Sequence, residues 1–272
     1  MKMMLIKMLI GRTKFNAWKK KNIVEDYVDI GDIKMYYAMF GIGEPVFLLH
    51  GGMVDYTTWF FQIKELAKYF RIIAPDTRAH GRTTDSYKPL SYELFASDIV
   101  QLMKKLDIEK ASFVGWSDGG CTSLVLGLKY RELVNKLVLI GTPYNISNYF
   151  PEIFESFSNV DPNNLPKDYK FIKKAYEKVA SDPDNWPKLV EKGMDMARRE
   201  PNFMLDQLKN IENPTLIIDG EKEQLYPLEV IKEMADAIPN ARLELIPGGT
   251  HLALIEKPKP INHLIVSFLK NE

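Results

Sequence analysis

The 272-residue sequence has a single cysteine, Cys121, and no excess of charge of either sign. One cysteine excludes an intrachain disulfide and a cysteine-rich zinc site. Lysine and arginine together number 36, as do aspartate and glutamate, so the formal net charge is zero. A balanced charge provides no basic face for nucleic acid, and we therefore expect no nucleic-acid partner.

Long hydrophobic runs are also missing. No segment approaches the ~20 consecutive apolar residues of a membrane-spanning helix, so we expect no membrane partner. Residues 1–10 are apolar and partly match a secretion signal, but Lys7 interrupts the run and no small-x-small cleavage site follows before Trp18. This favours a cytoplasmic protein over an exported one. The lysine run at 19–21 is expected to lie in solvent.

Strand-like and helix-like segments alternate along most of the chain. Hydrophobic residues make up 46% of it, enough for one large core. The alternation predicts an α/β fold with a mostly parallel central sheet flanked by helices. The predicted elements are an edge hairpin over 25–30 and 33–40, strands at 46–49, 71–74, 111–114, 134–140, 215–218 and 243–246, and helices at 59–69, 92–106, 121–130 and 228–237, with a last helix through Leu269.

The alternation stops after Gly141. Residues 143–211 contain no clear buried strand, and prolines interrupt their helical stretches. We interpret this segment as a helical cap insertion between two core segments, 1–142 and 212–272. The cap is expected to shape the substrate pocket, to which we assign Tyr144 together with Met53 and Trp116 of the core. Further aromatic and apolar candidates in the cap, most of them expected to be packing residues, are Tyr149, Phe150, Phe154, Phe157, Trp186 and Met194.

The most informative segment is Val-Gly-Trp-Ser-Asp-Gly-Gly at residues 114–120, between a strand-like and a helix-like run. It fits Gly-x-Ser-x-Gly. A serine at a sharp strand-to-helix turn projects its hydroxyl from a strained backbone, and the neighbouring glycines avoid the clashes that a Cβ would cause. The segment predicts that Ser117 is a nucleophile. The alternative is a glycine-rich turn in which Ser117 only caps the helix.

A second glycine motif, His50-Gly51-Gly52, follows the predicted strand at 46–49. Acyl transfer places negative charge on the carbonyl oxygen of the substrate, and backbone N–H groups aimed at that oxygen stabilise it. The amides of Gly52 and Asp118 are the predicted donors, because both lie at the carboxyl ends of parallel strands, where sites form in such sheets. His50 is expected to order its loop rather than to catalyse.

A histidine and a carboxylate follow the last two predicted strands. His251 can take the proton of the serine and later deliver it to the leaving group. Glu223 can orient that histidine and stabilise its charged form, although Asp219 and Glu221 compete for this role. The order serine, acid, histidine along the chain is that of the α/β-hydrolases.

On these motifs the chain resembles α/β-hydrolase-fold serine hydrolases from about Glu25 to Leu269. Two positions depart from the family pattern. Glu223 stands where the family usually has aspartate. Ala79 stands where it usually has glycine, within the segment 76–83 whose Asp76 and Arg78 we expect to brace loops near the site. The resemblance implies a hydrolase of small carboxylic esters with no cofactor and no metal, active as a monomer or homodimer.

The form Trp-Ser-Asp-Gly-Gly at 116–120 resembles the valacyclovir-hydrolase-like group, which cleaves α-amino-acid esters. The resemblance implies that the Asp118 carboxylate can pair with a substrate ammonium. A carboxylate in the first turn of a helix is also stabilised by the helix dipole, by about 0.3–1 kcal/mol, and we favour this simpler explanation. The fold also supports lactone hydrolysis, carbon–carbon bond hydrolysis, peroxyacid formation and non-catalytic receptors, so fold alone does not decide.

Overall fold

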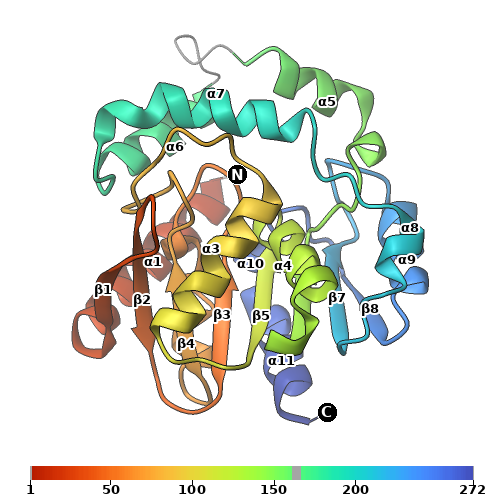
Figure 1. Ribbon diagram of the computed structural model, residues 1–272, viewed down its shortest axis with the longest axis horizontal. Coiled ribbons are helices and arrows are strands. Elements are labelled where there is room, and N and C mark those ends of the chain that lie inside the picture. The colour runs from red at the N-terminus through yellow and green to blue at the C-terminus, as the bar shows by residue number, and fades with distance from the viewer. Residues whose placement is uncertain (1, 161–166, 272) are drawn as a thin grey trace.

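The computed structural model describes residues 2–160 and 167–271 and is built around an eight-stranded sheet (Figure 1). The strand order across the sheet is β1-β2-β4-β3-β5-β6-β7-β8. Strand β2 is antiparallel to both β1 and β4, and every other neighbouring pair is parallel. The predicted sheet and its edge hairpin are therefore confirmed. The strands are β1 (Val24–Asp29), β2 (Lys34–Phe40), β3 (Pro45–Leu49), β4 (Arg71–Pro75), β5 (Ala111–Trp116), β6 (Val134–Ile140), β7 (Thr215–Gly220) and β8 (Ala241–Ile246).

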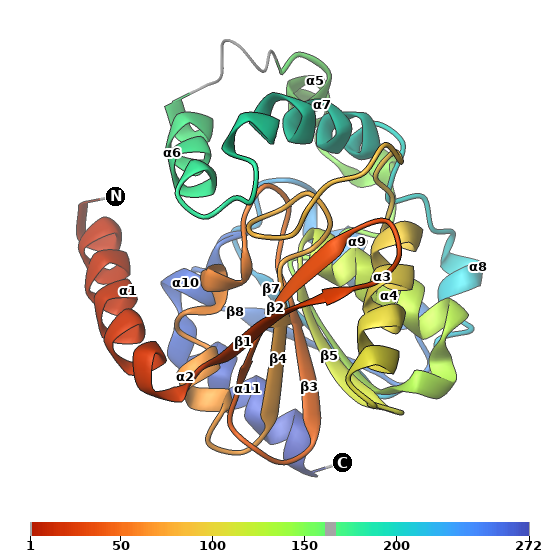
Figure 2. The same cartoon turned by 60° about the vertical axis from the view of Figure 1, so that its left-hand side comes forward.

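Helices cover both faces of the sheet (Figure 2). The α-helices are α1 (Lys2–Asn22), α2 (Ile63–Leu66), α3 (Tyr92–Lys105), α4 (Asp118–Lys129), α5 (Pro151–Ser158), α6 (Lys167–Glu177), α7 (Trp186–Ala197), α8 (Leu205–Leu208), α9 (Leu228–Ala237), α10 (Ala253–Glu256) and α11 (Pro258–Asn271). Short 3-10 turns are η1 (Tyr56–Trp59), η2 (Arg131–Leu133), η3 (Ile146–Asn148) and η4 (Pro183–Asn185).

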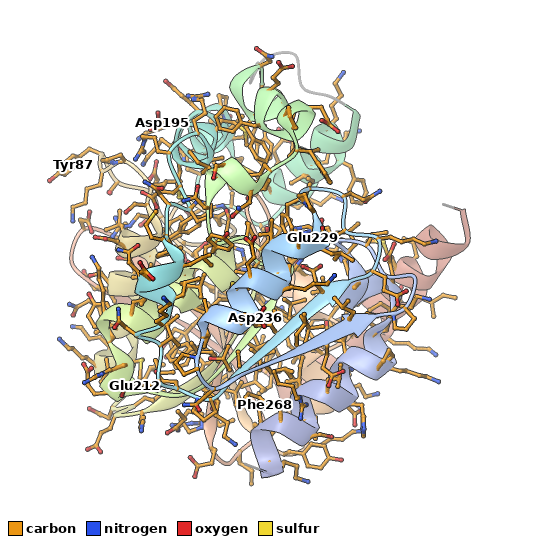
Figure 3. The ribbon with its side chains drawn as sticks, turned by 90° about the vertical axis from the view of Figure 1, so that its right-hand side faces the viewer. Tyr87, Asp195, Glu212, Glu229, Asp236 and Phe268 are labelled. Carbon is orange, nitrogen blue, oxygen red and sulfur yellow. The ribbon has the colours of Figure 1, made fainter. Side chains whose placement is uncertain are left out.

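Two apolar clusters fill the space between the sheet and its helices. Phe47 and Leu49 of β3 belong to the cluster under α3, α4 and α9, whereas Val46 and Leu48 belong to the cluster under α2 and α11. Because successive side chains of a strand point to opposite faces, a strand buried on both faces is apolar throughout. On α9 the outer positions Glu229 and Asp236 are exposed (Figure 3).

Helices α5, α6 and α7 form a layer above the sheet, as expected for a cap (Figure 1). The only strand-like pairing within the described part of the insertion is an isolated bridge between Asn145 and Asn202. Helix α8, at the end of the insertion, packs on α4 and α9 instead. The division of the chain at residues 142 and 211 remains a prediction.

The predicted continuous helix over 59–69 is wrong. The structure has η1, a turn, and the four-residue α2 there. The Gln62 side chain donates to the Leu254 carbonyl at 2.9 Å and to Asn262 Oδ1 at 3.0 Å. The chain at 67–70 also abuts Gly41, where a Cβ would lie 2.4 Å from the Ala67 carbonyl oxygen. These tertiary contacts override a local helical pattern.

The 21-residue helix α1 has no counterpart among the predicted elements (Figure 2). Its apolar residues do not follow one face, so periodicity did not reveal it. Phe15 is buried between Trp18 and Phe40, with ring centroids 6.2 Å away in both cases. Lys19, expected in solvent, donates to the Tyr56 hydroxyl instead. Across the described residues, no helix has the length and apolar character to cross a membrane.

Candidate active site

Ser117 lies at the turn between β5 and α4 with φ 54° and ψ −118°, a conformation that costs a non-glycine residue energy. The turn is held by very close backbone packing. A Cβ on Gly119 would lie 2.0 Å from the Leu49 carbonyl oxygen, and one on Gly115 would lie 2.2 Å from the carbonyl oxygen of Gly119. The Ser117 side chain makes no capping hydrogen bond, so the alternative explanation, that it only caps α4, does not hold.

The loop after β3 lies directly against this turn. A Cβ on Gly51 would be 2.9 Å from the Trp116 ring and 3.3 Å from Ser117 Cβ. A Cβ on Gly52 would be 2.6 Å from Asp118 Oδ2. The structure thus brings the Gly52 and Asp118 segments together beside Ser117, as an oxyanion hole would require.

His50 is buried and orders this loop. Its Nδ1 lies 2.7 Å from the Gly51 carbonyl, and its Nε2 accepts from the Thr77 amide at 3.0 Å. These two partners assign the proton to Nδ1. Burial lowers the pKa of His50, so the ring stays neutral. Both contacts fit the ordering role expected for His50.

The segment after β4 braces the neighbouring loops, as expected. The Asp76 carboxylate accepts from the Tyr56 amide and from the Arg82 amide, both at 2.9 Å. The Arg78 guanidinium is buried and forms two-pronged pairs with Asp98, at 2.7 and 2.8 Å, and with Asp32, at 2.9 Å for both bonds. Arg78 thereby ties the β1–β2 turn to α3.

Glu223 and His251 form a pair at the carboxyl ends of β7 and β8. His251 Nδ1 lies 2.9 Å from Glu223 Oε2, and the Glu223 side chain is fully buried. Glu223 Oε1 accepts from the Gln224 and Leu225 amides at 2.7 and 2.9 Å. Burial alone would raise the pKa of Glu223, but the hydrogen bond and the charge of His251, followed by the hydrogen bonds from the Leu225 amide and from Asp219, outweigh that effect and lower it.

In the described structure neither of the two competing acids makes a hydrogen bond to His251. Asp219 accepts from the Tyr226 hydroxyl at 3.0 Å and from the Gly220 amide at 2.7 Å. Burial, then the charge of Glu223 and a hydrogen bond to it, raise the pKa of Asp219 well above its usual value. Glu221 is exposed and accepts from the Gly248 amide at 3.0 Å. Within this carboxyl pair the raised pKa therefore belongs to Asp219 and the lowered pKa to Glu223.

Trp116 links the nucleophile turn to the histidine loop. Its Nε1 donates to the His251 carbonyl at 3.0 Å, and the two rings lie 5.6 Å apart. Within residues 2–160 and 167–271, no hydrogen bond joins the Ser117 hydroxyl to the His251 ring. Such bonds are often long before a substrate binds. The nitrogen Nε2 of His251 is left for that contact.

Asp118 stands in the first turn of α4, and its side chain contacts a residue that the sequence did not suggest. The Tyr92 hydroxyl donates to Asp118 Oδ1 at 3.0 Å. Burial raises the pKa of Asp118, and the hydrogen bond from Tyr92 and the nearby His251 oppose the rise. Tyr92 opens α3 as an ordinary apolar position, so no local pattern identifies it.

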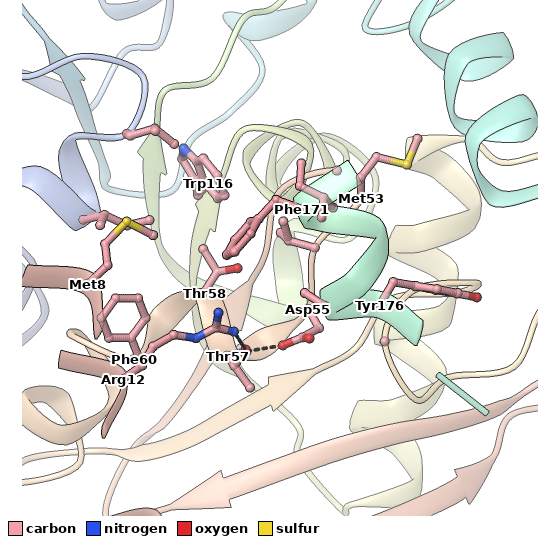
Figure 4. A pocket seen from close by; sticks show the side chains of 17 residues that line it. Met8, Arg12, Met53, Asp55, Thr57, Thr58, Phe60, Trp116, Phe171 and Tyr176 are labelled. Atoms are coloured by element: carbon pink, nitrogen blue, oxygen red, sulfur yellow. Dashed lines mark hydrogen bonds between the residues drawn. The ribbon is translucent and has the colours of Figure 1, made fainter. Parts of the chain in front are cut away.

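A cavity of about 280 Å³ adjoins the site (Figure 4). Gly52, Met53 and Trp116 line one part of it, and Ile172 and Tyr176 of the cap line another. Tyr144, predicted to contact substrate as well, is not brought there. It lines a separate hollow with Phe203, and its hydroxyl donates to Glu233 at 2.8 Å. Tyr144 lies four residues after the end of β6 in sequence, but the backbone at this position directs its side chain toward α9 rather than toward the cavity.

The described cap aromatics differ in exposure. Trp186 is fully buried against Tyr176, with ring centroids 5.3 Å apart, and so serves as packing. Tyr149 lies near Asp118 and Glu223, whose charges contribute to raising its pKa after the main effect of burial.

Among the described residues, no group of three or more histidine, cysteine or acidic side chains is arranged to hold a metal ion.

Comparisons with known proteins agree with this architecture. The family model described as the alpha/beta hydrolase fold matches residues 44–192, more than half of the chain. The serine hydrolase BPHL of Homo sapiens is 28% identical and aligns over 89% of this chain and 85% of its own length. The crystal structure of the CarC enzyme, a serine hydrolase involved in carbazole degradation, is 26% identical with a TM-score of 0.77, covering 92% and 100% of the two chains. Est816, an N-acyl homoserine lactone degrading enzyme, is 27% identical with a TM-score of 0.76, covering 89% and 100%.

Proposed function

Since this chain belongs to the α/β-hydrolase fold family and is a hydrolytic enzyme, we propose that it cleaves small carboxylic esters through a covalent acyl intermediate on Ser117. One observation carries the proposal. The strained Ser117 turn, the glycine loop at Gly52 and the pair Glu223–His251 meet at one edge of the sheet. This set supplies a nucleophile, amide donors and an oriented base.

In the proposed reaction Ser117 Oγ attacks the carbonyl carbon of the ester while its proton passes to His251 Nε2. The carbonyl oxygen becomes an oxyanion, and the amides of Gly52 and Asp118 donate to it. The intermediate collapses when the bond to the alcohol oxygen breaks and His251 returns the proton to that oxygen. Water then repeats the sequence on the acyl-serine, which releases the acid and restores Ser117.

Glu223 has two tasks in this scheme. Its contact with Nδ1 of His251 keeps the ring in the tautomer whose Nε2 is free to accept the serine proton, and its charge stabilises the imidazolium that follows. Asp219 supports it by holding a proton. The site therefore carries one negative charge beside His251 rather than two, which limits repulsion between the buried carboxyl groups.

Labelling with a fluorophosphonate and peptide mapping test the proposal. We expect the adduct on Ser117 and none in a Ser117→Ala protein. The same variant should hydrolyse short p-nitrophenyl esters at least about a thousandfold more slowly, since the nucleophile is lost. A Ser147→Ala protein, altered at an exposed serine, is the control. Turnover at the parent rate by Ser117→Ala would contradict the proposal, and a panel of esters, lactones, amides and β-diketones decides between the chemistries of this fold.

A second candidate substrate class is α-amino-acid esters. The observation that favours it is the Asp118 carboxylate, which lies beside Gly52 and whose hydrogen-bond partner is the uncharged Tyr92. A buried carboxylate in that position gains from a cationic partner. Asp118→Asn keeps the backbone amide in place. If the class is right, the variant loses about tenfold or more of its preference for an amino ester over the matched ester without the amine. Equal losses on both esters would leave the helix-dipole explanation.

A further inference from the structure

The cavity beside the site has a wall that the catalytic motifs do not supply. Met8 and Arg12 of helix α1 line it together with Gly52 and Trp116 (Figure 4). The loop of Gly52 and the β5 end at Trp116 adjoin Ser117. Helix α1 therefore closes the substrate space from the side.

The position of Arg12 follows from how α1 packs. A Cβ on Gly11 would lie 2.5 Å from the Phe61 ring and 2.8 Å from the Phe60 ring, so the helix backbone approaches these aromatics closely. Phe15, one turn further, is buried in the core. Arg12 Nη2 then reaches the Thr57 hydroxyl, at 3.1 Å. These contacts direct a guanidinium to the cavity.

The charge of Arg12 has no carboxylate partner within ion-pair distance among the described residues. Its hydrogen bond goes to a neutral hydroxyl. Asp55, the carboxylate among the described residues of the cavity wall, accepts from the Thr57 amide at 2.7 Å and forms no ion pair with Arg12. Asp55 thus caps η1, and within the described residues Arg12 makes one hydrogen bond, which leaves its other N–H groups for an anionic ligand.

The rest of the lining suits an apolar spacer. Most of the other side chains of the wall are apolar. The apolar ones are Met53, Val54, Phe60, Phe171, Ile172, Ala175, Leu252 and Ile255. A guanidinium binds a carboxylate strongly, because its planar fork matches the two carboxylate oxygens. The volume of about 280 Å³ limits the occupant to a small molecule.

We propose that Arg12 binds a carboxylate on the substrate, so that the enzyme prefers small esters with an acidic group separated from the scissile carbonyl by a short apolar spacer. The inference rests on the proposed ester hydrolysis and names its substrate class. Arg12 is a specificity-determining residue in this scheme, and helix α1 is part of the active site.

Kinetics on matched esters test the inference. One pair is the mono-p-nitrophenyl ester of adipic acid and the same ester of its monoamide. The other pair is 3-acetoxyphenylacetate and its amide. In at least one pair the wild type should favour the acid by about tenfold or more in kcat/KM, the selectivity of a charge-assisted hydrogen bond. Arg12→Gln should bring that ratio close to one, and Arg12→Lys should give an intermediate value.

Lys14→Gln is the matched control, because Lys14 is an exposed cation on the same helix. It should keep the ratio of the wild type. A ratio near one for both pairs in the wild type, or a ratio that Arg12→Gln leaves unchanged, overturns the inference. Thermal unfolding of each variant shows whether α1 remains docked, and Arg12→Lys provides a folded comparison if Arg12→Gln does not.

Binding separates failure of this inference from failure of the proposed hydrolysis. Calorimetric titration with 3-phenylpropionate and 3-phenylpropionamide needs no turnover. The wild type should bind the acid about tenfold more tightly than the amide, and Arg12→Gln should lose that difference. If no ester is hydrolysed but this difference appears and depends on Arg12, the anion site stands and the proposed reaction fails. If the difference persists in Arg12→Gln, the acid binds elsewhere and the inference is wrong.

Discussion

The loops at the sheet edge and the helices that cover them are held by different kinds of contact. In the loops, backbone lies on backbone. A Cβ on Gly119 would be 2.0 Å from the Leu49 carbonyl oxygen, and one on Gly220 would be 2.4 Å from that of Gly249. In the covering layer, flexible side-chain ends make the contacts. A Cβ on Gly193 of α7 would lie 2.3 Å from the terminal methyl of Met53 and 3.7 Å from its Sδ.

The difference separates catalysis from selectivity. Backbone contacts leave the reacting groups little freedom, and such preorganisation is what acyl transfer needs. A side-chain contact, such as the 3.1 Å hydrogen bond between Arg12 and Thr57, can be removed by one substitution that leaves the sheet in place. We therefore expect changes in the loops to abolish turnover or folding and changes in the cover to alter which substrate is used.

The largest effect should come from Glu223→Gln. The amide no longer supplies the charge that holds His251, and we expect kcat to fall by about a thousandfold to ten-thousandfold with p-nitrophenyl esters. Asp219→Asn is the matched control, since the pKa of Asp219 is raised and the neutral amide replaces a carboxyl that makes no hydrogen bond to His251, so the change should cost less than about tenfold. A larger loss in Asp219→Asn than in Glu223→Gln would mean that the acid is assigned to the wrong residue.

A matched pair of glycine substitutions tests the comparison through stability. Gly119→Ala forces a Cβ against the Leu49 carbonyl, and we expect the free energy of unfolding to drop by about 3 kcal/mol. In Gly193→Ala the methyl of Met53 can move aside, and alanine gains up to about 1 kcal/mol of helix propensity, so stability should change by about 1 kcal/mol or less. Denaturant titration measures both. Equal losses would show that the two layers are packed alike.

The smallest effect concerns an ion pair at the β1–β2 turn. The pKa of Asp32 in the folded protein lies below its unfolded value near 3.8. The main cause is the pair of hydrogen bonds from Arg78. The pair therefore stabilises the fold above that pH, and the contribution is lost as the pH falls toward the folded pKa. Asp32 is partly exposed, so we expect less than about 1 kcal/mol.

In Asp32→Asn the difference from wild type in unfolding temperature should be constant above pH 5 or so and shrink below about pH 4. Thermal melts at pH 3.5, 5 and 7 give this profile. A difference that grows on acidification has the wrong sign for a depressed carboxyl and would rule out this account.

Sequence patterns predicted the elements whose burial follows a regular period. The strand at 134–140 and the helix at 228–237 have the predicted bounds. The patterns failed where a contact from afar decides the backbone. Gln62 binds residues almost 200 positions away, and the helix expected over 59–69 is broken there. Helix α1 has no apolar face, and only its packing on the core reveals it.

The candidate site divides in the same way. Gly-x-Ser-x-Gly, the glycine loop and the acid and histidine after the last strands are local signals, and the structure brings their residues to one edge. The position three residues after Gly220 favours Glu223 over Asp219 and Glu221. The observed contact between Glu223 and His251 agrees with that choice. The Tyr92 contact to Asp118 and the placement of Tyr144 beside Phe203 have no local signal.

The sequence by itself determined the strands of the sheet and the helices α3, α4 and α9 between them, the serine turn and the chemical types of the reacting groups, because periodicity and glycine spacing act over a few residues. The tertiary structure decided which carboxyl group contacts His251 and which side chains line the cavity. It also decided that helix α1 forms part of the cavity wall. These depend on burial and on distances between segments such as Arg12 and Thr57, which local pattern does not encode.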